Sequence, residues 1–236
     1  MELTKTQKVS ASMVGSNSLS GISAFCIVQD AVTEFMGELK IDGPTIKRKY
    51  NAFWVFVRTR IKFYKSLMWN DEYTVTAFIS SKSLAKMNID VEVRAGSDIA
   101  LYGRVELCVL DIATQKIKKI ATVGVDDTIT TQQAREEITF SRLDNMELTF
   151  IEQIKVRSTN IDYSHHTNNV EYIRFILNTY STRELEEKDI KEIEVAYLSQ
   201  TYENDVLDVF KAKRSGKDYI ALQCGGKPVV KCEIVF

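Results

Sequence analysis

Residues 160–180 read NIDYSHHTNNVEYIRFILNTY, and they contain the pattern from which the fold follows. Asn168 is a favourable helix N-cap, and Glu171, three residues later, is placed to complete a capping box. Apolar side chains then recur every three or four residues, which predicts a helix that buries one face. These apolar positions are Val170, Ile173, Ile176, Leu177 and Tyr180.

The two histidines of the chain, His165 and His166, stand side by side just before this helix. A helix N-terminus presents unpaired backbone N–H groups and a partial positive charge, which together suit a developing oxyanion. We therefore expect the amides of Asn168, Asn169 and Val170 to bind such a charge, with an imidazole close by.

Composition restricts the functional class. The chain has 31 basic and 32 acidic residues among 236, whereas a nucleic-acid-binding domain is usually basic. The first ten residues contain no apolar leader core, and no segment approaches the roughly 18 apolar residues of a membrane span. We expect a cytoplasmic protein without a nucleic-acid partner or a membrane span.

The four cysteines are scattered along the chain and form no C-x-x-C pair. None has a histidine at metal-ligand spacing, so the sequence predicts reduced core thiols, no metal site and no cofactor. They are Cys26, Cys108, Cys224 and Cys232.

The rest of the chain reads as strands around a second helix. Alternation predicts a strand within residues 3–12, and an apolar stripe predicts a helix over 19–36, capped by Ser18 or Ser20. Residues 37–51 contain Gly43 and Pro44 and are predicted to be an exposed loop. Strand patterns follow at 52–69, 72–81, 87–96, 99–112, 150–158, 193–200, 206–214, 218–225 and 228–236.

The order of strand, helix and several strands occurs twice. Asn70-Asp71 matches Asn204-Asp205 at an offset of 134 residues, and the two helix starts match at an offset of 148. We therefore predict two copies of one unit, at residues 1–125 and 148–236, joined by a polar linker at 126–147. A unit of one long helix wrapped by a curved antiparallel sheet is the hot-dog arrangement, so the predicted fold class is α+β with two tandem hot-dog units.

The run from Asp162 to Tyr172, DYSHHTNNVEY, resembles the D-x-N-x-H-x-N-N-x-x-Y signature of acyl-acyl-carrier-protein thioesterases of the plant and bacterial type. The segment 54–71 also resembles the first domain of that family, so the likeness spans both halves. The resemblance implies tandem hot-dog domains that hydrolyse the thioester between a fatty acyl chain and acyl carrier protein. It places Asp162 and His166 on the family's catalytic aspartate and histidine.

Two positions depart from the family pattern. Ser164 stands where the family usually has asparagine, and Gln200 falls where the family often has a glutamate proposed to activate water, with Thr201 beside it. Glutamine cannot act as a base, although it can orient a water molecule or donate to an oxyanion. Imidazole titrates near neutrality, so His166 is the candidate that accepts a proton from water or positions the water, and Asp162 is the candidate that orients the imidazole or attracts a water. Ser164, Gln200 and Thr201 complete the candidate catalytic residues, as hydrogen-bond partners of the water or the substrate.

The first copy lacks this constellation, because residues 13–21 read MVGSNSLSG. We expect it to hold the acyl chain, with Phe53, Trp54 and Phe56 as candidate lining residues. Acyl carrier proteins are acidic, and three basic clusters are candidate docking patches: Lys47–Lys49, Lys116–Lys119 and Lys211–Arg214. Three functions stay open: a carrier-protein thioesterase, a coenzyme A thioesterase, and a non-catalytic acyl-thioester-binding protein. The chain is expected to act as a monomeric pseudo-dimer or as a homodimer.

Overall fold

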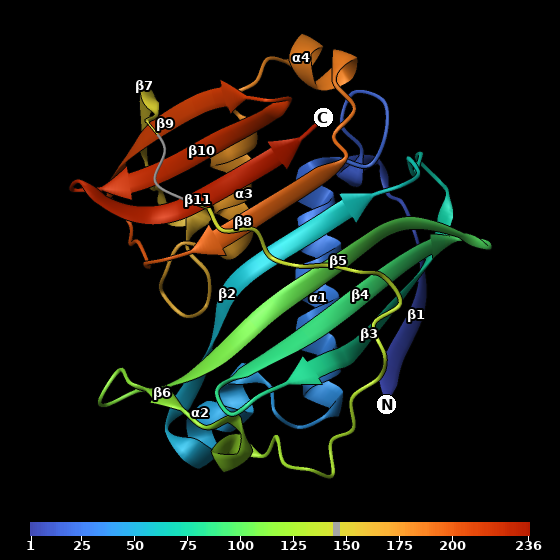
Figure 1. Cartoon of the computed structure of the whole chain (residues 1–236), viewed down its shortest axis with the longest axis vertical. Coiled ribbons are helices and arrows are strands. Elements are labelled where there is room, and N and C mark those ends of the chain that lie inside the picture. Colours follow the sequence, from blue (N-terminus) through green and yellow to red (C-terminus); the bar gives the residue numbers. More distant parts are fainter. Residues whose placement is uncertain (144–146) are drawn as a thin grey trace.

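Two helices lie against one face of a single antiparallel sheet (Figure 1). The structure is a computed structural model, and it describes residues 1–143 and 147–236. The strands run in the order β1-β3-β4-β5-β2-β8-β11-β10-β9-β7, and β6 pairs with β5. Their bounds are β1 Glu2–Lys8, β2 Ala52–Phe63, β3 Glu72–Lys82, β4 Lys86–Ala95, β5 Asp98–Asp111, β6 Ile117–Lys118, β7 Thr149–Lys155, β8 Glu192–Tyr197, β9 Val206–Arg214, β10 Lys217–Cys224 and β11 Lys227–Val235.

The two halves of the sheet are built alike and meet where β2 pairs with β8. Each half has the same tight turn between two of its strands, β2 and β3 in the first half and β8 and β9 in the second. In this turn an asparagine adopts a positive φ, 70° at Asn70 and 74° at Asn204. The following aspartate accepts a hydrogen bond from the amide three residues earlier in both turns, at 2.7 Å for Asp71 and 2.8 Å for Asp205. The predicted tandem repeat and α+β class are confirmed.

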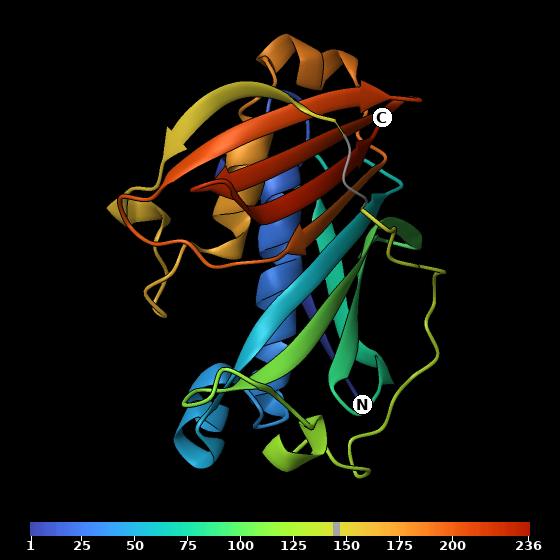
Figure 2. The ribbon, with the colours of Figure 1, turned by 60° about the vertical axis from the view of Figure 1, so that its left-hand side comes forward.

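The helices are α1 Gly21–Glu38, α2 Gly43–Tyr50, α3 Asn169–Leu177 and α4 Thr182–Glu187, with single 3-10 turns at η1 Ala11–Met13, η2 Ile120–Val123 and η3 Ser158–Asn160. Ser20 caps α1, because its hydroxyl accepts from the amide of Ser23 at 3.1 Å. Figure 2 shows α1 and α3 side by side on the same face of the sheet. No helix within the described residues is long and apolar enough to cross a membrane.

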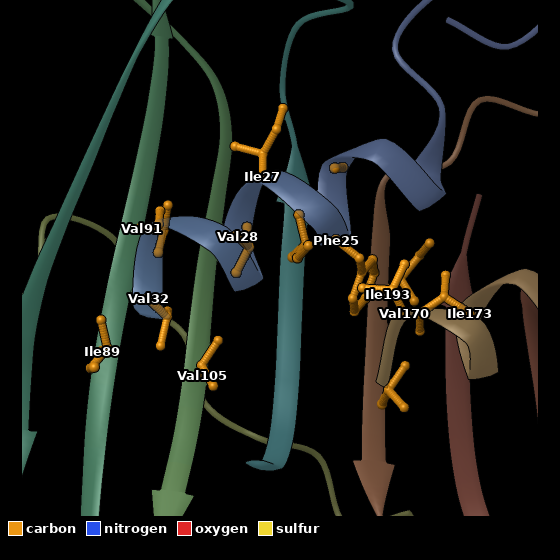
Figure 3. Packing of buried hydrophobic residues seen from close by; sticks show 14 of the residues in the cluster. Phe25, Ile27, Val28, Val32, Ile89, Val91, Val105, Val170, Ile173 and Ile193 are labelled. Atoms are coloured by element: carbon orange, nitrogen blue, oxygen red, sulfur yellow. The ribbon is translucent and has the colours of Figure 1, made fainter. Parts of the chain in front are cut away.

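One continuous hydrophobic core joins the halves (Figure 3). In the first half, Val28 of α1 lies directly over Gly103 of β5, where an added Cβ would approach a Val28 methyl to 3.0 Å. In the second half, Val170 and Ile173 of α3 point toward Ile193 of β8. The absence of a side chain at Gly103 therefore lets α1 pack closely on its sheet.

The predicted loop at 37–51 is wrong, since residues 43–50 form α2. Asp42 caps this helix by accepting from the amide of Thr45 at 2.9 Å. Pro44 occupies the first turn, where a backbone N–H has no partner within the helix, so the missing N–H of proline costs no hydrogen bond. Ile46 is fully buried and anchors the helix. The two residues that suggested a loop are the start signal of a short helix.

Two element ends also differ from the sequence prediction. Strand β2 stops at Phe63 rather than running to Trp69, and the chain crosses to the turn at Asn70 as a loop. Helix α3 ends at Leu177, and Ser181 then caps the separate helix α4. Helix α3 is consequently half as long as α1, with 9 residues against 18.

The polar segment 126–143 crosses the sheet on the face opposite the helices (Figures 1 and 2). Arginine side chains of the sheet donate to its backbone carbonyls: Arg58 to Ser141, Arg60 to Thr139 and Arg104 to Ile138. Positions 144–146 of the predicted linker lie outside the described residues.

Candidate active site

The loop before α3 is a narrow hairpin. Ile161 and Thr167 form an isolated antiparallel bridge, and the amide of Asp162 donates to the carbonyl of His166 at 2.9 Å. His165 reverses the chain with φ of 66°, a conformation that non-glycine residues rarely adopt. The hairpin therefore fixes His166 directly in front of the helix N-terminus.

The side chains of Asp162 and His166 are not hydrogen-bonded to each other. The Asp162 carboxylate accepts from the amide of Ser164 at 2.8 Å and from its hydroxyl at 2.5 Å. Within residues 1–143 and 147–236, no side chain or backbone group is hydrogen-bonded to the imidazole of His166. Its ring rests against Tyr202, with centroids 5.2 Å apart and planes inclined by 59°. Asp162 thus shapes the loop that carries the half-buried imidazole.

Asn168 is the N-cap of α3, as the sequence predicted, but the predicted capping box is absent. The Asn168 side chain accepts from the amide of Val170 at 3.0 Å, and its own amide donates to the carbonyl of Asn160 at 2.9 Å. Glu171 accepts instead from the side-chain amide of Asn160 at 2.7 Å. Of the three amides expected to bind an oxyanion, only that of Asn169 lacks a partner among the described residues.

A buried cluster of three hydroxyl groups ties the hairpin to the loop after β8. The Thr201 hydroxyl lies 2.7 Å from that of Thr167 and 2.8 Å from that of Tyr172. The amide of Thr167 also donates to the Thr201 carbonyl at 2.9 Å. Burial raises the pKa of Tyr172. All three hydroxyl groups of this cluster are hydrogen-bonded within the protein, so Thr201 positions the hairpin. Its neighbour Gln200 is exposed.

A narrow cavity begins beside the N-terminus of α3, between α1 and the sheet. Its volume is about 10 Å³, which is room for about one water molecule, and its walls are mostly apolar. It is lined by Phe25, Val28, Gln29, Phe56, Thr59, Val105, Val170 and Tyr197. Of the three aromatic residues predicted to line an acyl tunnel, Phe56 lines this small cavity. Trp54 instead donates its indole N–H to the carbonyl of Ile41.

Gln29 connects this cavity to the hairpin, since its side-chain amide donates to the side-chain oxygen of Asn168 at 3.3 Å. Sequence reasoning assigned Gln29 no role and did not single out Thr167. The only signal for Gln29 was a polar side chain within the buried stripe of α1.

The remaining candidates have simpler surroundings. His165 and Ser164 are exposed. The four cysteines are free, and burial raises the pKa of each thiol, which disfavours the nucleophilic thiolate. No group of three or more His, Cys, Asp or Glu residues in the described part of the chain is arranged to hold a metal ion.

Residues 143–225 match the family model of the acyl-ACP thioesterase C-terminal domain. This chain is similar to the acyl-ACP thioesterases. It is 19% identical to oleoyl-acyl carrier protein thioesterase 2 of Arabidopsis thaliana, over 75% of this chain and 52% of that protein. The corresponding enzyme of Coriandrum sativum is 20% identical, over 74% and 51% of the two chains. The chain thus spans about half the length of these curated relatives.

Solved structures of this family share the whole fold. An acyl-ACP thioesterase from Bacteroides thetaiotaomicron aligns with a TM-score of 0.82 and 16% identity, covering 100% of this chain and 97% of that one. The 12:0-ACP thioesterase from Umbellularia californica aligns with a TM-score of 0.83 and 17% identity, covering 99% and 96%. The predicted resemblance to this family and the tandem hot-dog fold are confirmed.

Proposed function

We propose that this protein is a thioesterase that hydrolyses fatty acyl-acyl carrier protein to free fatty acid and carrier, a step of fatty acid biosynthesis. The observation that carries the proposal is the hairpin of residues 161–167. It holds an imidazole with unengaged nitrogens at the mouth of α3, beside a backbone amide that has no partner among the described residues. The likeness to acyl-ACP thioesterases in fold and in residues 143–225 supports the choice of substrate class.

In the proposed reaction, His166 accepts a proton from a water molecule as its oxygen attacks the thioester carbonyl carbon. The amide of Asn169 and the positive end of α3 stabilise the resulting oxyanion. When the tetrahedral intermediate collapses, the C–S bond breaks, and the imidazolium returns the proton to the leaving thiolate. Gln200 has no acid–base capacity, so its part is limited to orienting the water.

We further propose that Asp162, Ser164 and Thr201 act by positioning. Asp162 and Ser164 bond to each other across the hairpin, and Thr201 holds Thr167 at its base. A hairpin fixed at both ends holds the imidazole in one position relative to the bound thioester. This matters because small displacements of a catalytic group reduce the reaction rate strongly. Asn168 sets the start of the helix on which the oxyanion donor depends.

The acyl chain is proposed to bind in the first half of the protein, residues 1–125, and to enter it through the narrow cavity between α1 and the sheet. The cavity opens beside Val170, next to the proposed thioester position, and Phe25, Val28 and Phe56 provide apolar walls. Each methylene buried there contributes roughly 0.8 kcal/mol. At about 10 Å³ the cavity holds no acyl chain in this conformation, so side chains around it must move apart on binding.

The carrier protein is proposed to dock near α2. Two of the three basic clusters form one surface here, since Lys118 of β6 donates to the carbonyl of Tyr50 at the end of α2. We call this the α2–β6 basic surface; its exposed side chains are Lys47, Arg48, Lys49, Lys116 and Lys119. Tyr163 of the hairpin reaches Gly43 at the start of α2, so this surface adjoins the proposed site. In the third cluster, the Lys211 side chain is only 9% exposed.

A thiol-release assay tests the function. Dodecanoyl, hexadecanoyl and oleoyl thioesters are each presented on acyl carrier protein and on coenzyme A at equal concentration. The proposal expects turnover, with a higher kcat/KM on the carrier protein for the same acyl chain. A preference for coenzyme A would make the protein an acyl-CoA thioesterase. Binding without thiol release on either carrier would refute hydrolysis and leave an acyl-thioester-binding protein.

A further inference from the structure

The first half of the chain contains a counterpart of the candidate site. Residues 13–21 fold into a hairpin closed by a bridge between Val14 and Leu19, as residues 160–169 do with Ile161 and Thr167. Three hydrogen bonds from a backbone amide to a backbone carbonyl recur in the two hairpins. The bond from Asp162 to His166 (2.9 Å) corresponds to that from Gly15 to Ser18 (2.8 Å), and the bond from Asn168 to Asn160 (2.9 Å) to that from Ser20 to Met13 (3.0 Å). The bond from Thr167 to Thr201 (2.9 Å) corresponds to that from Leu19 to Leu67 (2.7 Å).

In this counterpart the reactive side chains are missing but the frame is intact. Gly15 and Ser18 take the places of Asp162 and His166 in the recurring bonds. Neither can supply a base or a carboxylate. A ligand held here therefore would not be hydrolysed by the proposed mechanism.

The counterpart opens into the large cavity of the protein, with a volume of about 530 Å³, at the end of the molecule that carries α4 (Figure 1). Helix α3 stops at Leu177, and Leu177, Asn178 and Tyr180 line the cavity. The cavity and the His166 hairpin lie at opposite ends of α3, about 13 Å apart along a nine-residue helix. A volume of this size is typical of small-molecule sites.

The cavity walls combine apolar and polar side chains, and two carboxylates, Glu186 and Asp189, are among the polar ones. Helices, strands and the chain between α4 and β8 all contribute apolar side chains: Ile22, Phe63, Leu101, Leu177, Leu185 and Ile190. Three lysines also line it, and two of them are paired, Lys65 with Asp98 and Lys191 with Asp189. Lys188 has no carboxylate within ion-pair distance among the described residues. Its ammonium group lies 4.9 Å from the ring centroid of Phe236.

We propose that this cavity is a second, non-catalytic site for a free fatty acid, with the alkyl chain against the apolar side chains of the lining and the carboxylate on Lys188. The ammonium of Lys188 stands beside the apolar side chains of the cavity. A fatty carboxylate matches both features, because its charged end would pair with the ammonium while its alkyl chain leaves water against the apolar side chains. The choice of a fatty carboxylate rests on the proposed function, whose product belongs to this class. The open cavity receives this ligand without the rearrangement that the narrow cavity requires.

Isothermal titration of the whole protein with sodium dodecanoate, below its critical micelle concentration, tests the site. Leu185→Trp places a larger side chain in the cavity, where it would obstruct an alkyl chain, and Lys188→Met removes the charge while keeping a chain of similar length. Leu84→Trp and Lys213→Met are matched controls, because neither residue lines the cavity and both are exposed. We expect both cavity variants to raise the Kd for dodecanoate at least tenfold and both controls to leave it within twofold. Lys188→Met should also abolish the preference for dodecanoate over 1-dodecanol.

Unchanged dodecanoate affinity in Lys188→Met and Leu185→Trp would overturn the assignment. The assignment would also be overturned if the protein bound 4′-phosphopantetheine but not dodecanoate and Leu185→Trp removed that binding, because the ligand class would then be wrong. Calorimetry needs no turnover, so a failure of the proposed hydrolysis and a failure of this site give separate results. The thiol-release rate of Lys188→Met at initial, product-free conditions is expected to equal that of the wild type.

Discussion

Replacing Thr201 by valine should destabilise the protein through a single orphaned hydroxyl. Tyr172 is 2% exposed, and its hydroxyl has Thr201 as its hydrogen-bond partner at 2.8 Å. Thr167 keeps a second partner, because its hydroxyl also donates to the Thr201 carbonyl at 3.1 Å. A buried hydroxyl without a partner costs about 1–3 kcal/mol, so we expect Thr201→Val to lower the free energy of unfolding by about 2 kcal/mol.

Tyr172→Phe removes the same hydrogen bond from the other side without leaving an orphan. Its expected cost is about 1 kcal/mol, the net value of one hydrogen bond. In the double variant, both polar partners are gone, so the loss should stay near 1 kcal/mol instead of the sum of about 3 kcal/mol. Urea unfolding of the four proteins at 25 °C, followed by circular dichroism, gives the coupling energy. Single losses that add to within about 0.4 kcal/mol would refute the account of this cluster.

Three further predictions concern other parts of the chain. Charge reversal of Lys47 and Lys49 to Glu should raise KM for acylated carrier protein roughly tenfold at low salt, about 1.4 kcal/mol, whereas the same change at Lys213 and Arg214 should not; equal KM values for both variants would exclude the α2–β6 basic surface. Gly103→Ala should lower the free energy of unfolding by about 1–3 kcal/mol because its Cβ would meet Val28, and Val28→Ala in the same chain should recover part of that loss in urea unfolding; an unchanged midpoint for the single variant would contradict the close packing of α1. Hydrogen bonds from Thr114 and the ammonium of Lys118 lower the pKa of Asp111 from 3.8 to about 2, so its stabilising effect is complete above 3.8 and is lost as the pH falls toward 2. Asp111→Asn should therefore lose less stability than wild type between pH 5 and pH 2.5, and parallel losses would show that this carboxylate contributes nothing.

Local signals in the sequence predicted the elements well. The caps at Ser20 and Asn168 and the asparagine turns at Asn70 and Asn204 each depend on a few neighbouring residues, and all four occur in the structure. The repeat could be found from the turns because both copies must reverse the chain at the same point. The strand patterns from Glu72 onward agree with the observed strands to within a few residues.

The errors arose where distant residues decide the outcome. Glu171 was expected to bond to Asn168, but Asn160 is brought close by the bridge between Ile161 and Thr167 and takes its place. Helix α2 was missed because Gly43 and Pro44 are turn residues in general, and only the burial of Ile46 shows that the segment packs as a helix.

The candidate site was predicted in part. The sequence identified the residues of the hairpin, and the structure brings Asp162, Ser164 and His166 together in it. It did not predict the cluster around Thr201, whose partners are 29 and 34 residues away in the chain. Nor did it predict the bond from Gln29 to Asn168, which spans 139 residues. Contacts at such separations follow from the packing of the two halves, which local patterns do not specify.

The central claim is that one imidazole at the mouth of α3 activates water. Single-turnover thiol release from dodecanoyl-acyl carrier protein by His166→Ala tests it most directly, with His165→Ala as the matched control from the neighbouring, exposed position. We expect His166→Ala to lower the rate by about 10²–10⁴-fold, the usual contribution of general-base catalysis, and His165→Ala to stay within about threefold of wild type. A His166→Ala rate equal to that of wild type, or an equal loss in both variants, would contradict the claim.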